Sequence, residues 1–232
     1  MGVLIELEGI DGSGKGTQAQ RLVKRLTDEG WSVELFSFPR YTETAFGKIV
    51  GDFLNGRFGS LEEVDPFVAA LFYAGDRFES RRLLKAALDK TDVVVCDRYV
   101  ASNVAHQAAK LENAEQQAEL IEWVERLEFD VFGLPRPDLV LLLDVPVEVS
   151  QQLIAHKEKR SYTDRKADLQ EANLSYLEKV RRLYHQLAQR PQWRLVECVK
   201  QNQLLSVEAV HELLWQEVSR LLNKNEPNVL PN

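Results

Sequence analysis

The chain has 232 residues, of which 44% are hydrophobic and 28% are charged, and its formal net charge is −7. This length allows one sizeable hydrophobic core, while the negative charge excludes general nucleic-acid binding, which needs a basic surface. No apolar run approaches the roughly 20 residues that span a bilayer, and the first residues lack the basic lead and cleavage site of a signal peptide, so we expect a cytoplasmic protein with no membrane or nucleic-acid partner.

Apolar runs alternate with amphipathic stretches along the chain, and this alternation indicates an α/β fold in which a five-stranded parallel sheet is flanked by helices. Strands are expected at residues 3–9, 31–39, 92–98, 138–146 and 193–199. Helices are expected at residues 16–29, 43–57, 65–90, 102–129, 146–157, 168–190 and 206–222. With no internal repeat, we expect one domain over residues 1–223, containing a charged connection at about 155–168 and followed by a flexible tail at 224–232.

The cysteines and histidines do not suggest a metal site. Cys96 and Cys198 lie in apolar runs, so we expect buried, reduced thiols rather than a disulfide. The histidines show neither metal-ligand nor catalytic spacing, and they are His106, His156, His185 and His211.

A glycine-rich loop follows the first expected strand. Its sequence, GIDGSGKGT, departs at one position from the phosphate-binding pattern G-x-x-x-x-G-K-S/T. Glycines let backbone N–H groups approach phosphate oxygens, the following helix N-terminus favours an anion, and Lys15 can reach the terminal phosphates. The predicted nucleotide-binding residues are Gly9, Ile10, Asp11, Gly12, Ser13, Gly14, Lys15, Gly16 and Thr17.

Two further segments end expected strands. DVVVCDRYVASN places Asp97 and Arg98 at a carboxyl end of the sheet, where open α/β folds bind ligands. Asp97 could hold magnesium through water and Arg98 could bridge phosphates, although a surface ion pair is an alternative. FSFPRY ends the second strand, so Phe38, Arg40 and Tyr41 can project into the same cleft or form a plain turn.

Two helical or charged segments carry weaker signals. Tyr73 and Arg77 stand four residues apart on one expected helix face, which suits a base beside a phosphate but is also typical of a core. The charged connection is either a solvated loop or a set of mobile cations that close over phosphates. Its cations are Lys157, Lys159, Arg160, Arg165 and Lys166.

In this order, these segments resemble the thymidylate kinases, which belong to the nucleoside-monophosphate kinase branch of P-loop proteins. The most specific matches are DRYVASN, FPRY and PDLVLLLDVP, and the likeness runs from Val3 to about Leu222. The resemblance implies a P-loop nucleoside-monophosphate kinase fold with a basic lid. It also implies Mg²⁺-dependent transfer of the ATP γ-phosphoryl to dTMP, and a homodimer.

The resemblance further implies roles for single residues. Tyr73 would stack on thymine, with Phe72 as the alternative, while Arg77 and Asn103 would contact the thymine edge. The implied substrate-binding residues are Asp11, Phe38, Arg40, Tyr41, Tyr73, Arg77, Arg98, Ser102, Asn103, His106, Asp168 and Glu171. The implied catalytic residues are Lys15, Arg98, Asp11, Arg160 and Arg165.

The chain departs from its relatives at three places. Some thymidylate kinases carry an arginine within the glycine loop, whereas residues 10–13 hold none here, so Arg160 and Arg165 of the lid must supply that cation. Gly16 replaces a hydroxyl, so we infer that nucleotide oxygens and water hold magnesium, steadied by Asp97 and Thr17. His106 replaces the Tyr or Phe common in relatives. This replacement leaves open whether the site discriminates deoxyribose from ribose, and a purely structural role for His106 is an equally good account.

No general base is expected, because a nucleoside monophosphate loses its second proton near pH ~6 and the site has mainly to neutralise charge. Other acceptors such as dUMP, dGMP or AMP remain alternatives that GKGTQ slightly favours, but Tyr73, FPRY and DRYVASN outweigh it in favour of dTMP. A deoxynucleoside kinase would need a general base, which the loop does not clearly show. A GTPase switch would need an N-K-x-D segment, which the sequence lacks. A non-catalytic ATP-binding module is the alternative from another functional class.

Overall fold

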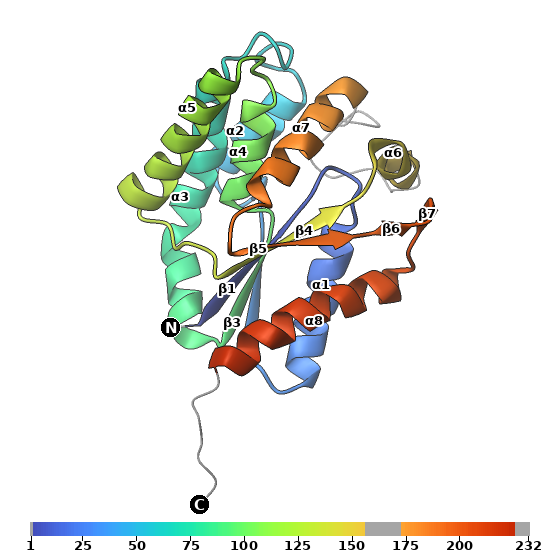
Figure 1. Ribbon diagram of the computed structural model, residues 1–232. Coiled ribbons are helices and arrows are strands. Elements are labelled where there is room, and N and C mark those ends of the chain that lie inside the picture. The colour runs from blue at the N-terminus through green and yellow to red at the C-terminus, as the bar shows by residue number, and fades with distance from the viewer. Residues whose placement is uncertain (1, 156–172, 226–232) are drawn as a thin grey trace, which may run out of the picture.

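The apolar runs form the strands of one parallel sheet, in the order β2-β3-β1-β4-β5. The computed structural model of the chain describes residues 2–155 and 173–225 (Figure 1). The five strands are β1 (Val3–Glu8), β2 (Val33–Ser37), β3 (Val93–Asp97), β4 (Leu139–Asp144) and β5 (Trp193–Glu197). The expected five-stranded α/β fold is therefore confirmed.

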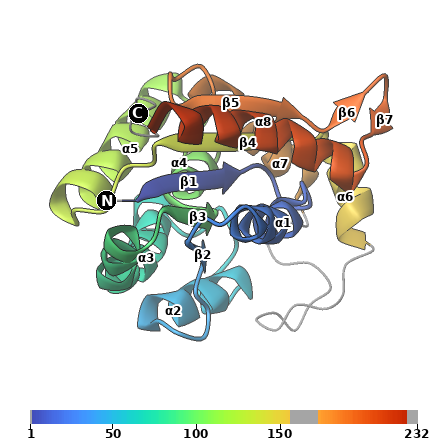
Figure 2. The same cartoon turned by 90° about the horizontal axis from the view of Figure 1, so that it is seen from below.

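Helices cover both faces of this sheet (Figure 1). They are α1 (Lys15–Asp28), α2 (Ala45–Leu54), α3 (Pro66–Lys90), α4 (Val100–Ala108), α5 (Ala114–Glu125), η1 (Arg126–Val131), α6 (Val147–Ala155), α7 (Leu174–Leu187) and α8 (Val207–Asn225). The helices α1 and α8 pack on one face, while α3, α4, α5 and α7 pack on the other. Seen from below, α2 lies beside α3 at the periphery (Figure 2).

The alternation of side chains along β1 assigns each residue to one face. Ile5 and Leu7 belong to the core beneath α1 and α8. Leu4 belongs to the opposite core, so Glu6 and Glu8 point toward the α4 side. Both glutamates are buried, at 1% and 0% exposure, and they accept hydrogen bonds from the start of α4.

The carboxyl ends of the three neighbouring strands meet at one edge of the sheet. Leu7 of β1 and Ser37 of β2 both pair in register with Asp97 of β3. The glycine loop, the segment after Asp97 and the segment after Ser37 therefore leave the sheet side by side, which is where open parallel sheets bind ligands.

The structure differs from the expected local structure at three places. Residues 102–129 do not form one helix, because the chain turns after Ala108 and restarts at α5, whose Asn113 side chain accepts from the N–H groups of Glu115 and Gln116. A two-stranded hairpin, β6 (Val199–Lys200) and β7 (Gln203–Leu204), follows β5 and was not expected. Helix α8 runs to Asn225, past the expected end of that helix at residue 222.

The expected state of the cysteines agrees with the structure, in which Cys96 and Cys198 are buried and free. Burial raises the pKa of Cys198 to about 12 and raises that of Cys96 well above its ordinary value. Both thiols are therefore protonated at neutral pH. Within residues 2–155 and 173–225, none of the helices is long and apolar enough to cross a membrane.

Candidate active site

The glycine loop connects β1 to α1 and leaves the start of that helix open. Gly14 is the N-cap of α1 and adopts φ 89°, a left-handed conformation that glycine reaches without strain. No side chain caps the helix there, so its first N–H groups are available to an anion. Gly12, at φ 82°, brings the loop so close to the Ser150 carbonyl that a side chain would collide with it.

Lys15 is buried and turns back into the loop. Its Nζ donates to the carbonyl oxygens of Gly9 and Ile10, both at 2.8 Å, and to Ser13 Oγ at 3.3 Å. Burial, followed by the nearby positive charge of Arg98, lowers the pKa of Lys15 to about 7. Burial and Arg98 therefore destabilise the charged form of Lys15, and anionic phosphate oxygens would stabilise it.

Arg98 joins the glycine loop to α4. Its backbone has φ 65°, its Nη2 donates to Asp11 Oδ1 at 2.6 Å, and its Nη1 donates to Ser102 Oγ at 3.1 Å. Burial lowers the pKa of Arg98, but Asp11 and other nearby groups outweigh burial and raise it well above its ordinary value. A permanent, doubly anchored positive charge therefore lies beside Lys15.

Gly16 lies directly against the carboxylate of Asp97. A Cβ at position 16 would be 3.2 Å from Asp97 Oδ2, so a side chain at this position would lie in close contact with the carboxylate. Thr17 is exposed on the next position of α1. Within the described part of the chain, no cluster of three or more His, Cys, Asp or Glu could hold a metal ion. A carboxylate oxygen beside a phosphate loop still fits Mg²⁺, which prefers oxygen ligands and keeps several waters.

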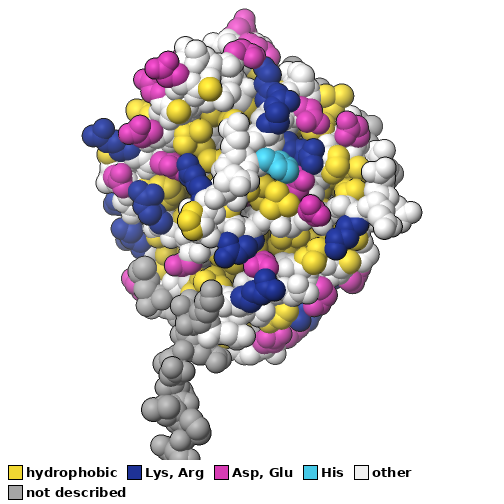
Figure 3. Space-filling view, in the orientation of Figure 1, with side chains coloured by type: hydrophobic (Ala, Val, Ile, Leu, Met, Phe, Trp, Pro, Cys, Tyr) yellow, Lys and Arg dark blue, Asp and Glu magenta, His cyan; other side chains and the backbone are white. Residues whose placement is uncertain are grey.

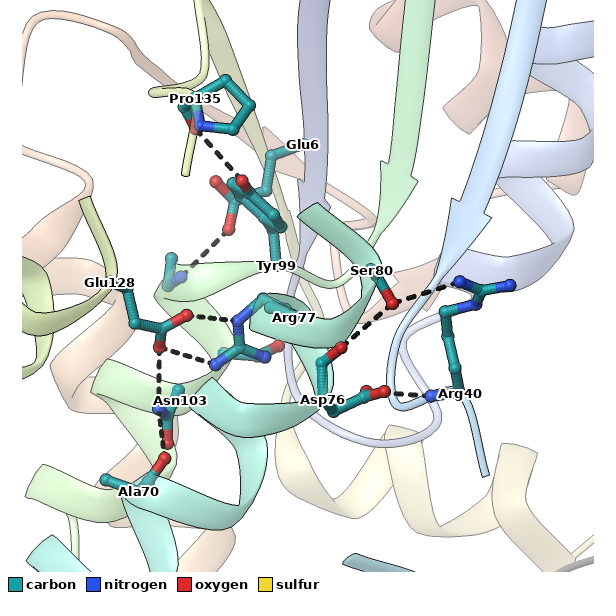
Figure 4. Close-up of polar contacts among 12 residues, drawn as sticks. Glu6, Arg40, Ala70, Asp76, Arg77, Ser80, Tyr99, Asn103, Glu128 and Pro135 are labelled. Atoms are coloured by element: carbon teal, nitrogen blue, oxygen red, sulfur yellow. Dashed lines mark hydrogen bonds and ion pairs between the residues drawn. The ribbon is translucent and has the colours of Figure 1, made fainter. Parts of the chain in front are cut away.

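The segment after β2 is anchored to α3 by Asp76 (Figure 4). This fully buried carboxylate accepts from the Arg40 N–H at 2.9 Å and from Thr44 Oγ1 at 2.5 Å. Arg40 Nη1 also donates to Ser80 Oγ at 3.1 Å. Phe38 is buried and Tyr41 is half-buried against the same core. The structure thus places all three FPRY residues singled out from the sequence at this edge.

Arg77, Asn103 and Glu128 form one buried polar cluster (Figure 4). Arg77 donates from Nε to Glu128 Oε2 at 2.5 Å and from Nη2 to Glu128 Oε1 at 2.7 Å. Asn103 Nδ2 donates to Glu128 Oε1 at 2.9 Å, while Asn103 Oδ1 is buried without a partner. Tyr73 lies one turn before Arg77 and packs edge-on against Phe53. The structure therefore brings together the residues expected to contact the nucleotide base, and Glu128 links Arg77 to Asn103.

His106 is buried and neutral. Burial, followed by the charge of Arg98, lowers its pKa to about 3. Tyr176 donates its hydroxyl proton to the His106 carbonyl at 2.8 Å, and the same hydroxyl lies 3.1 Å from His106 Nδ1. Because that hydroxyl has one proton, Nδ1 must be the donor of the second contact. His106 Nε2 is then a bare acceptor, and it is buried without a partner.

Comparison with known proteins places this site in a family. The model of the family described as thymidylate kinase matches residues 7–214, which contain the glycine loop, Asp97, Arg98 and the polar cluster. The chain belongs to the thymidylate kinase family. The probable thymidylate kinase of Pyrococcus abyssi is 36% identical over 214 residues, covering 91% of this chain and 93% of the relative. The human thymidylate kinase is 32% identical over 213 residues, covering 91% and 87%.

A partial relative and a solved structure extend the comparison. The thymidylate kinase of Mycobacterium tuberculosis is 39% identical over 149 residues, covering 64% of this chain and 68% of that protein. The solved thymidylate kinase of Candida albicans superposes with a TM-score of 0.73 at 23% identity, covering 97% of this chain and 94% of the other. The two proteins share a fold, the P-loop nucleoside-monophosphate kinase architecture expected of a thymidylate kinase.

Some expected residues of a thymidylate kinase lie outside the described part of the chain. They are the cations Lys157, Lys159, Arg160, Arg165 and Lys166 and the acidic pair Asp168 and Glu171. Their assignments remain predictions.

Sequence reasoning missed four buried carboxylates that accept hydrogen bonds around the site, namely Glu6, Glu8, Asp76 and Glu128. The first two had a visible signal, because acidic residues two apart in a strand with apolar neighbours must point to one buried face. Asp76 directly precedes Arg77 and looked like an ordinary polar position on a helix. Glu128 lay in a stretch expected to be regular helix, and its partner Arg77 is 51 residues away.

Proposed function

We propose that this chain catalyses the Mg²⁺-dependent transfer of the γ-phosphoryl group of ATP to dTMP, giving dTDP and ADP for dTTP synthesis. The observation that carries the proposal is the arrangement of Lys15 and Arg98. One cation lies within the glycine loop, and the other is held between Asp11 of that loop and Ser102 of α4. Family membership supports the reaction and both substrates.

The donor end of the site is the loop from Gly9 to Thr17. Its N–H groups and the start of α1 would bind the ATP phosphates, and Lys15 would exchange the carbonyl oxygens of Gly9 and Ile10 for phosphate oxygens. Asp97, through water, and Thr17 would hold magnesium. When bound, the ion supplies neutralisation of the negative charge that moves with the γ-phosphoryl.

The acceptor end is built from α3, α4 and the segment after β2. Arg98 would bind the dTMP phosphate and orient it toward the donor, because charge neutralisation and alignment are what phosphoryl transfer requires. Tyr73, Arg77 and Asn103 would surround the base, beside Phe38, Arg40 and Tyr41. No side chain needs to remove a proton, since the acceptor phosphate is already ionised at neutral pH.

Several finer assignments belong to the same proposal. The lid at residues 155–168 would supply Arg160 and Arg165 to the transferring group, and Asp168 and Glu171 would follow it. His106 would lie beside the acceptor sugar with Ser102. We assign the chain to a single domain that acts as a homodimer in the cytoplasm. The free cysteines fit a reducing compartment.

The test is a coupled assay of ADP formation with Mg²⁺ and a panel of dTMP, dUMP, UMP, dGMP and AMP. We expect the highest kcat/KM for dTMP, and we expect Lys15→Ala to abolish turnover while leaving the fold intact by circular dichroism. A preference for AMP or dGMP would overturn the assignment of the base pocket but keep the phosphoryl-transfer machinery. ATP binding with no turnover on any acceptor would overturn the proposal and favour a binding module.

A further inference from the structure

The start of α4, which carries Ser102, is not capped by its own sequence. Its N-cap residue Tyr99 offers no side-chain hydrogen bond to the first turn. Instead, the N–H groups of Tyr99 and Ser102 donate to Glu8 Oε1 at 2.9 and 3.1 Å, and the Ala101 N–H donates to Glu6 Oε1 at 3.0 Å. Two glutamates of β1 therefore satisfy the free N–H groups of α4 and place carboxyl oxygens at its positive end.

The second oxygen of Glu8 controls the Ser102 hydroxyl. Glu8 Oε2 accepts from Ser102 Oγ at 2.7 Å and from the Tyr184 hydroxyl at 2.7 Å. Because the single Ser102 proton points at Glu8, the oxygen presents lone pairs elsewhere, and it accepts from Arg98 Nη1 at 3.1 Å. A Ser102 hydroxyl free to rotate would present its proton to the Arg98 cation part of the time.

We propose that Glu8 is a positioning residue for phosphoryl transfer, which holds the Arg98 guanidinium in place by fixing the direction of the Ser102 hydroxyl. The inference rests on the proposed function only in the role given to Arg98. Asp11 holds one side of the guanidinium, and the Glu8–Ser102 link holds the other. Glu8 itself is fully buried, so it acts through Arg98 and touches no substrate.

Glu6 provides a matched control for Glu8. Both carboxyl groups lie on one face of β1, two residues apart, and both accept from the start of α4. Burial, followed by the neighbouring Glu8 charge, raises the pKa of Glu6 well above its ordinary value. In Glu6→Gln the amide oxygen can still accept from the Ala101 N–H. Glu8→Gln instead places an N–H₂ group, which cannot accept a hydrogen bond, among the N–H and O–H groups that donate to Glu8.

The experiment compares Glu6→Gln, Glu8→Gln and Ser102→Ala with the wild type in the dTMP assay. Glu8→Gln is expected to lower kcat/KM for dTMP roughly ten- to hundredfold, because small misplacements of a positioned group have such effects. The KM for ATP is expected to stay unchanged, and Glu6→Gln should stay within about threefold of the wild type in both parameters. Equal losses in the two glutamine variants, or a parallel loss of ATP affinity, would overturn the proposal.

A double-mutant cycle tests whether Glu8 acts through Arg98. Glu8→Gln added to Arg98→Ala should lower the residual rate no further, whereas an independent structural effect would lower it by the same factor again. If Glu8→Gln fails to fold, Ser102→Ala carries the cycle, because it leaves the backbone contacts of Glu8 intact.

A readout without substrate separates this inference from the proposed function. The NMR signal of the Arg98 side-chain Nε–H, assigned by its absence in Arg98→Ala, should be equally sharp in the wild type and Glu6→Gln and broadened in Glu8→Gln. If the wild type fails to phosphorylate dTMP but this pattern holds, the proposed function falls and the positioning of Arg98 stands. An unchanged signal in Glu8→Gln overturns the inference.

Discussion

Lys15 illustrates how a binding residue can be kept unsatisfied before its ligand arrives. Its buried ammonium group donates hydrogen bonds to carbonyl and hydroxyl oxygens of the loop. The pKa of Lys15 falls from 10.5 to about 7. Between these two pH values the unfolded chain binds a proton that the folded chain does not, so the contribution of Lys15 to stability rises with pH across that window. Phosphate oxygens would reverse the shift, since a nearby negative charge favours the charged amine.

We therefore predict that ADP binding at pH 8 takes up close to one proton, because Lys15 is mostly neutral before binding and charged afterwards. Calorimetric titrations in Tris and HEPES, whose ionisation enthalpies differ, measure this uptake directly. The control is Lys15→Arg, whose side chain stays charged throughout and should remove the uptake. Binding enthalpies that are identical in the two buffers for the wild type would show that Lys15 is already protonated.

Among the elements, η1 is explained by the residue at its centre. This π-helical turn follows α5 directly, and it carries Glu128 into the core, where it pairs with Arg77 of α3 and Asn103 of α4. π-Helical segments occur mostly as single turns within α-helices, and they are frequent at functional sites. Together with Asn103, the Arg77–Glu128 pair joins α3, α4 and η1 around the expected base pocket, and the pair is almost completely shielded from water.

We predict that Glu128→Ala lowers the free energy of unfolding by about 3–5 kcal/mol, because it leaves the Arg77 cation buried without a partner. Urea denaturation measures the change. Glu125→Ala, at the end of α5, removes the partner of Arg190 in a partly exposed pair and should cost at most about 1 kcal/mol. Equal losses in the free energy of unfolding for the two variants would mean that burial does not make the Arg77–Glu128 pair more important for stability than the partly exposed pair.

The elements also show what sequence could and could not reveal. All five strands and the glycine loop were predictable, because apolar runs and glycine spacing are local signals. The break between α4 and α5 was missed, since Asn113 was the one local sign of a new helix start. Glu128 and Asp76 could not be assigned, because their roles depend on partners 51 and 36 residues away. The lid assignments stay predictions.

At the scale of the whole molecule, one stripe of apolar side chains stays partly exposed in the described chain. The face shown in Figure 3 carries interspersed acidic and basic side chains over α5 and α7. In contrast, α3 presents Val68, Leu71 and Phe78 at 45%, 41% and 44% exposure along one stripe, beside Phe46 of α2 at 36%. Contiguous exposed apolar side chains of this kind mark interaction sites. A second copy of the chain, related by a two-fold axis, would bury the same stripe on both partners.

We predict that Leu71→Glu converts a dimer into a monomer, because the interface would have to bury a charge without a partner. Size-exclusion chromatography with light scattering reports the mass directly. Leu204→Glu, at a similarly exposed residue of β7, should leave the mass unchanged. A wild type that is monomeric at micromolar concentration would remove the homodimer from the proposal.

The contact between Gly16 and Asp97 has a consequence for how this chain can diverge. A serine or threonine at position 16 would bring its Cβ to 3.2 Å from Asp97 Oδ2, a close contact that the flexible end of the aspartate side chain can relieve by moving a few tenths of an ångström. The added hydroxyl would then lie within reach of the carboxylate and could donate a hydrogen bond to it. The hydroxyl-bearing form of the loop is therefore open to descendants of this sequence by one substitution at position 16, with Asp97 kept at the end of β3.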